Sequence, residues 1–286
     1  MVLVDAVVQG VLLGGLYALF AAGLSLVFGV MRLVNIAHGD FIVLGAYIAL
    51  MVVSLTGLHP FLSLVLVVPL MGLIGYALQR LVLERTMGAD VLPPLLVTFG
   101  CAVIIQNALL ALFSTDAQRL SAGPIETASL PVGSISLGVL PLITFGVAVA
   151  LIAGLEVVFF RSRAGRAFRA TSDDAETAEA MGVDTRHVFA LAMALSFAVI
   201  AVAAVLLAAR SNFDPFAGPA RLLYGFEAVI IGGLGNLWGT LAGGIVLGVA
   251  QTLGAQVSPS FQILAGHLVF FLILALRPRG LFPRMD

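Results

Sequence analysis

The sequence predicts an all-α integral membrane protein, a polytopic bundle of about 8–9 transmembrane segments with broken helices. Of its 286 residues, 61% are hydrophobic and only 10% are charged, and the mean hydropathy is +1.14. A soluble domain carries about 25% charged residues to cover its surface. Long apolar runs recur along the whole chain, so we expect one transmembrane domain, residues 1–286.

The runs predict spans because a hydrocarbon core about 30 Å thick needs about 20 apolar residues. Asp5 and the lack of a basic start mark the first run as a span and not as a signal peptide. The run 225–253 is studded with glycine, and we expect two short segments there. The other expected spans are residues 5–31, 35–55, 61–83, 91–113, 139–160, 188–209 and 261–276.

The arginines predict the orientation, since basic residues stay in short cytoplasmic loops. With an outer N-terminus and a broken pair at 225–253, only Arg119, Arg210 and Arg221 lie outside. The external stretch 114–138 is either a connector or a docking surface for an outer partner. The arginines expected on the cytoplasmic side are Arg32, Arg80, Arg85, Arg161, Arg163, Arg166, Arg169, Arg186, Arg277, Arg279 and Arg284.

Composition also excludes several functions. The net charge of −1 argues against a nucleic-acid partner. All 14 basic residues are arginine, so the chain has no lysine for a P-loop or a Schiff base. Cys101 is the only cysteine, which excludes an intrachain disulfide. The four histidines are scattered, and neither a metal site nor a catalytic constellation is indicated, so we do not expect an enzyme.

The cytoplasmic loop 161–187 contains the clearest interaction motif. Asp173 and Glu176 stand at capping-box spacing, and Gly182 suits the end of a short helix. A helix of about eight residues is marginal alone. It is therefore either a solvated topology signal or, as we favour, a docking helix. The candidate docking residues are Arg166, Arg169, Asp173, Asp174, Glu176, Ala178, Met181 and Gly182.

Two further segments interrupt the apolar runs, at 35–40 and at 232–244. Polar groups within a membrane are costly and usually functional, and interrupted helices form binding sites in transporters. The first segment could equally be an ordinary turn at the membrane surface. Glycines four apart favour close helix packing over substrate contact. The candidate translocation-pathway residues are Asn35, His38, Gly39, Asp40, Glu227, Gly233, Gly235 and Asn236.

Three motifs, in order along the chain, resemble the branched-chain amino acid ABC importer permeases of the LivH type. They cover nearly the whole length of the chain. They are Asn35-Ile-Ala-His38-Gly39-Asp40-Phe41, then Gly165-Arg166-Ala-Phe-Arg169-Ala with Met181-Gly182-Val183, and Gly225-Phe226-Glu227-Ala228 with Gly232-Gly233-Leu-Gly235.

The resemblance implies an ABC importer permease fold in a bacterial inner membrane. It implies a second related permease or a homodimer, two cytoplasmic ATPase subunits that bind ATP and Mg, and a periplasmic substrate-binding protein. The short helix would then be the coupling helix. The cargo would be a branched-chain or other hydrophobic amino acid, while similar permeases import urea, short amides or aromatic carboxylates.

A rival from another class is a proton-coupled secondary transporter, in which Glu227 and His38 relay protons. It would need no docking helix and no ATPase. A passive channel explains the glycines but gives no role to the cytoplasmic helix. A membrane-embedded enzyme has the least support, because no nucleophile and base are paired.

Overall fold

The computed structural model describes residues 2–87, 90, 92–133 and 135–282. Val91, the predicted start of the fourth span, and Arg284 lie outside the described residues. Within them, seven helices are long and apolar enough to cross a membrane, and Phe261–Leu276 is a shorter apolar helix. The fold is therefore the polytopic helical bundle that the composition predicts.

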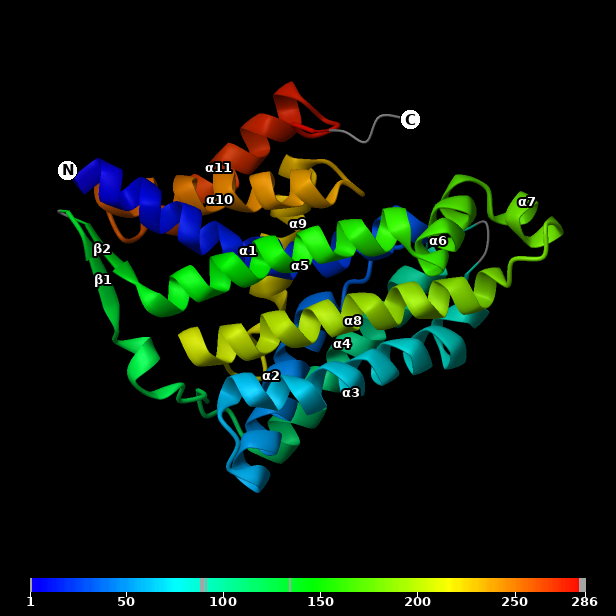
Figure 1. Ribbon diagram of the computed structural model, residues 1–286, viewed down its shortest axis with the longest axis horizontal. Coiled ribbons are helices and arrows are strands. Elements are labelled where there is room, and N and C mark those ends of the chain that lie inside the picture. The colour runs from blue at the N-terminus through cyan, green and yellow to red at the C-terminus, as the bar shows by residue number, and fades with distance from the viewer. Residues whose placement is uncertain (1, 88–89, 91, 134, 283–286) are drawn as a thin grey trace.

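The helices and strands follow one another in a simple order (Figure 1). The elements are α1 (Val2–Met31), α2 (His38–Thr56), α3 (Pro60–Leu81), η1 (Leu83–Arg85), α4 (Leu92–Phe113), η2 (Gly123–Glu126), β1 (Ser129–Val132), β2 (Ile135–Gly138), α5 (Val139–Arg161), α6 (Arg163–Asp173), α7 (Ala175–Ala180), α8 (Thr185–Arg210), α9 (Gly218–Gly232), α10 (Leu237–Val257) and α11 (Phe261–Leu276).

Helix α1 is the centre of the bundle. Its apolar stretch is 83% buried, whereas that of α4 is 17% buried and faces outward. Glycines bring α1 and α10 together: a side chain on Gly14 would meet the backbone of Ile245, and one on Gly248 would meet the carbonyl of Gly10. This close approach confirms that these glycines serve helix packing in a lipid environment.

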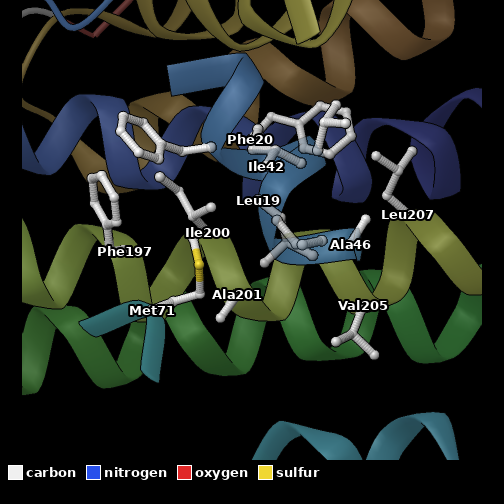
Figure 2. Close-up of a cluster of buried hydrophobic side chains, with 14 of the residues drawn as sticks. Leu19, Phe20, Ile42, Ala46, Met71, Phe197, Ile200, Ala201, Val205 and Leu207 are labelled. Atoms are coloured by element: carbon white, nitrogen blue, oxygen red, sulfur yellow. The ribbon is translucent and has the colours of Figure 1, made fainter. Parts of the chain in front are cut away.

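A second packing centre joins α1, α2, α3 and α8. Figure 2 shows side chains from all four helices meeting there, among them Leu19, Ile42, Met71 and Ile200. The rings of Phe41 and Phe197 lie 4.5 Å apart at its edge. This cluster fixes α2 against the bundle, which matters because α2 begins at the first predicted break.

The two ends of the bundle carry different segments. In Figure 1, α6 and α7 lie at one end, and the start of α1 and the β1–β2 hairpin lie at the other. Glu84 lies 3.5 Å from Arg186 and 3.0 Å from Arg80, so the segment after α3 also meets the start of α8. The arginine-rich loops share one end, which we call the cytoplasmic end.

The outer segment between α4 and α5 is folded. It contains the antiparallel β1–β2 pair, a small departure from an all-α chain. Gln118 pairs with Phe213, and the amide of Leu120 donates to the carbonyl of Ala208 at 2.9 Å. The segment is thereby attached to the outer end of α8.

Three predicted boundaries were wrong. The second span begins at His38, so Asn35 precedes it. The glycine-rich run is a broken pair, as expected, but α9 begins at Gly218 and α10 has 21 residues. The second member is thus long enough to span the membrane. The sequence obscured this because Pro219 and Arg221 fall in the first turn of α9 and interrupt the apolar run there.

Candidate functional sites

The cytoplasmic segment starts by folding back on α5. The Ser162 hydroxyl accepts from the amide of Gly165 at 2.8 Å and caps α6. Gly165 packs so closely on Phe159 that a side chain there would meet its carbonyl. The Arg169 guanidinium donates to that carbonyl and lies over the ring of Phe160. Arg169 therefore ties α6 to α5, while Arg166 is exposed.

The cap of α7 is Asp174, and the prediction of Asp173 was wrong by one residue. Asp173 is the last residue of α6, and the backbone becomes extended only at Asp174. The Asp174 carboxylate accepts from the Thr177 hydroxyl at 2.6 Å and from its amide at 3.0 Å. Both bonds lower the pKa of Asp174, and the bond from the Thr177 hydroxyl has the larger effect. Thr177, and not Glu176, takes the third helical position.

The end of α7 is as expected. Gly182 has φ 87°, its amide donates to the carbonyl of Glu179, and the amide of Val183 donates to that of Ala178. This pair of bonds is a Schellman ending. Ala178 is buried against the bundle, whereas Met181 is 81% exposed. The segment thus presents a large apolar side chain to the cytoplasm.

The first break, Asn35–Asp40, lies inside the bundle and not at its surface. The Nε2 atom of His38 lies 2.8 Å from the carbonyl oxygen of Phe20, well within α1. The side-chain oxygen Oδ1 of Asn35 accepts a hydrogen bond from the backbone amide of Ala37 at 3.0 Å. Both side chains are 1% exposed. The turn is therefore buried among the helices beside the middle of α1, and it is not a turn on the surface of the bundle.

Asp40 connects this break to α9. Its Oδ1 atom accepts from the Gln106 amide of α4 at 2.9 Å. A side chain on Gly218, the first residue of α9, would meet that same carboxylate, and one on Gly39 would meet the Gly218 carbonyl. A carboxylate beside a helix N-terminus is electrostatically favourable. Asp40 and Gly39 thus hold the start of α9 within the bundle.

The second break joins α9 to α10. Gly233 and Gly235 have φ 108° and 77°, conformations that other residues rarely adopt. The Asn236 side chain caps α10 by accepting from the amide of Gly239 at 2.9 Å. Its amide donates to the carbonyl of Phe282, so the C-terminal segment covers this break.

Glu227 lies between the two breaks and has a partner that the sequence did not reveal. Its Oε1 atom is 2.5 Å from Nδ1 of His267 on α11, and the residue is 1% exposed. Nearby, the Tyr17 hydroxyl donates to Oε1 of Gln251 at 2.5 Å. Sequence reasoning missed Tyr17 and Gln251. A polar side chain in an apolar span was the available signal, but partners from other helices cannot be read from it.

The predicted pathway residues therefore form three groups. Asn35, His38, Gly39 and Asp40 surround the start of α2. Glu227 pairs with His267. Gly233, Gly235 and Asn236 form the second break, where a side chain on Gly29 near the end of α1 would lie 3.3 Å from the Cα of Gly235.

Known proteins resemble this chain over almost its full length. A family model described as "Branched-chain amino acid transport system / permease component" matches residues 6–276. The permease protein BraD of Pseudomonas aeruginosa, of a high-affinity branched-chain amino acid transport system, is 29% identical over 98% of this chain and 95% of its own. LivH of Escherichia coli is 28% identical over 97% and 94%.

Two further matches are more distant. A probable branched-chain amino acid transport permease, LivH of Methanocaldococcus jannaschii, is 28% identical over 85% of this chain and 78% of its own. A chain of the solved structure of PsaBC from Streptococcus pneumoniae in complex with Fab aligns with TM-score 0.50 and 15% identity, covering 95% of this chain and 91% of that one. That structure supports the fold alone.

Proposed function

Because the chain belongs to the branched-chain amino acid transport system permease family, we propose that it moves branched-chain or other hydrophobic amino acids across the inner membrane. It is the transmembrane permease subunit of an ATP-driven ABC importer. The names of relatives that cover nearly the whole chain support this cargo. They favour amino acids over urea, short amides and aromatic carboxylates.

The partners follow from this role. A second related permease, or a second copy of this chain, completes the membrane unit. Two cytoplasmic ATPase subunits bind ATP and Mg, since this chain has no lysine for a P-loop. A periplasmic binding protein delivers the cargo at the outer end. There, the folded segment between α4 and α5 offers a surface attached to α8.

The coupling step uses the cytoplasmic segment as a lever. An ATPase subunit holds α7 through Met181, and its movement displaces α6. The Ser172 hydroxyl of α6 donates to the carbonyl of Gly29 at 2.6 Å, and Gly29 touches Gly235 at the second break. A shift of α6 thereby reaches the joint between α9 and α10.

The pathway residues require a rearrangement before they can meet cargo. Asn35, His38, Asp40 and Glu227 are each at most 2% exposed. A closed resting state is consistent with alternating access, in which the buried breaks open when the lever moves. Their direct contact with cargo stays a prediction.

The exposure of Met181 is the main support for the docking role of α7. A loop that is only solvated would not be expected to expose a large apolar side chain at the end of a helix that is capped at both ends. Replacing Met181 and Gly182 together with bulky charged residues is expected to abolish leucine uptake by the assembled importer and to reduce ATPase co-purification at least about tenfold. The protein should still insert and melt normally.

A charge introduced by substitution at the opposite end of the bundle provides the control. Ala117 is exposed on the outer segment, so Ala117→Glu should leave ATPase co-purification unchanged. Full leucine uptake by the Met181 and Gly182 double variant would contradict the docking role. A screen of ligands on the periplasmic binding protein tests the cargo: preference for urea or a sugar over leucine would contradict it.

A further inference from the structure

A polar cluster inside the bundle has more hydrogen-bonding capacity than the chain itself satisfies. It lies about midway along α1 and is built from four helices. We call it the Tyr17–Glu227 cluster, and its members are Tyr17 of α1, Arg221, Tyr224 and Glu227 of α9, Gln251 of α10 and His267 of α11.

Contacts show that these side chains form one group. The rings of Tyr17 and Tyr224 lie 5.0 Å apart, and Tyr17 donates to Gln251. The Gln251 Nε2 atom lies 3.0 Å from where a side chain on Gly266 would begin. That glycine adjoins His267, the partner of Glu227, so the contacts run around a closed ring.

Two buried polar atoms in this ring have no hydrogen-bond partner among the described residues. They are Oε2 of Glu227 and Nε2 of Gln251, and both residues are 1% exposed. One is an acceptor and the other is a donor. Buried polar atoms are nearly always paired, and polar residues within a membrane usually mark a substrate path. The pair of atoms therefore suits a ligand that carries both a donor and an acceptor.

The charges of the cluster have a defined arrangement. Arg221 lies three residues before Tyr224 on α9 and Glu227 lies three residues after it, so each is a neighbour of Tyr224 on the helix surface. Arg221 and Glu227 are six residues apart, or about 9 Å along the helix axis. Among the residues that the structure describes, Arg221 has no ion pair. An unpaired cation and a half-satisfied carboxylate thus flank one pair of tyrosines.

We propose that this cluster is a subsite for the zwitterionic head group of the transported amino acid. Oε2 of Glu227 accepts from the ammonium group. Nε2 of Gln251 and the guanidinium of Arg221 donate to the carboxylate, and the rings of Tyr17 and Tyr224 contact the aliphatic part. The inference rests on the proposed function, whose cargo it deepens.

The site is placed where a moving pathway could reach it. Glu227 and Arg221 lie on α9, whose two ends are the breaks beside Gly218 and Gly233. The His267 side chain is 34% exposed, and Arg221 and Tyr224 are half-buried. The cluster is therefore accessible from the side of Arg221, Tyr224 and His267, while Glu227 and Gln251 lie at its buried end.

The test uses the whole importer in proteoliposomes with leucine-loaded binding protein. It measures leucine moved per ATP hydrolysed, and separately the stimulation of ATP hydrolysis by the binding protein. We expect Arg221→Gln and Glu227→Gln each to lower the leucine-to-ATP ratio about tenfold, because each removes one charge-assisted hydrogen bond to the cargo. The stimulation of ATP hydrolysis by the binding protein should persist in both variants. Glu156→Gln, a change of an acid on α5 outside the cluster, should alter neither quantity.

The outcomes separate the possibilities. If Arg221→Gln keeps the wild-type ratio, or loses stimulation and transport in parallel, the subsite is wrong and the cluster is structural. Should Glu227→Gln fail to assemble, Arg221→Gln decides, because its side chain is half-buried. If the wild-type importer moves no leucine although its ATPase is stimulated, the proposed cargo fails, and the subsite for it fails too.

Discussion

Two regions of the molecule differ in how closely they are packed. The first consists of helices α1, α9 and α10, and the second is the segment α6–α7. In the first region, glycines let backbones touch: a side chain on Gly243 would meet the carbonyl of Ala228 at 2.0 Å. In the second, Gly182 has open space around it and serves only the turn that ends α7. The glycine contacts of the first region are made within the chain, whereas the second region ends in an exposed Met181. Tight packing makes the scaffold, and incomplete packing makes the docking site.

This contrast predicts different consequences for substitutions in the two regions. Variants in the glycine-packed helices should lower stability, whereas variants in α7 and at Gly182 should lower uptake and leave the melting temperature of the bundle unchanged.

The largest effect is expected at Gly243. Gly243→Ala forces α9 and α10 apart, and overpacking of this kind costs about 3 kcal/mol. The measurement is the thermal melting temperature of the purified protein in detergent. Gly154→Ala on α5, where no atom lies within 4 Å, should melt as the wild type does. Equal melting temperatures for the two variants would contradict the packing role.

A smaller loss of stability is expected from Asn236→Ala. It removes the cap of α10 and the bond to the carbonyl of Phe282, and a lost cap costs about 1 kcal/mol. The same melting assay applies. Asn107→Ala on the outward-facing α4 removes only a bond to the carbonyl of Val103 on its own helix, and it should change the melting temperature less. The reverse order would show that the break is not held by Asn236.

The capping residue of α7 can be tested without affecting the bundle. Asp174→Ala should speed hydrogen exchange of residues 175–182 about two- to tenfold, and the neighbouring Asp173→Ala should not. The lowered pKa of Asp174 means that the cap is fully present above the ordinary aspartate pKa of about 3.9. It is lost as pH falls through the lowered value. Faster exchange in Asp173→Ala alone would restore the sequence-based assignment.

The smallest effect is expected from Gly182→Ala. It strains a left-handed position by about 1 kcal/mol but meets no neighbouring atom. Leucine uptake should fall modestly, and the melting temperature should stay unchanged. A large drop in melting temperature would show that α7 is part of the scaffold.

The sequence predicted most of the fold because its signals were local. Apolar runs gave the spans, and glycines spaced four apart indicated close helix packing, although they did not identify α1 and α10 as partners. What failed depended on neighbours. The sequence placed the cap of α7 at Asp173, one residue too early. The cap is Asp174, because α6 continues through Asp173. His267 gave no hint of Glu227, since the two are 40 positions apart.

Leucine uptake into proteoliposomes that contain the whole importer tests the central claim most directly. The account predicts uptake that requires ATP and the loaded binding protein and is unchanged by a protonophore. Uptake that continues without ATP and collapses with a protonophore would contradict it, and would instead favour a proton-coupled carrier.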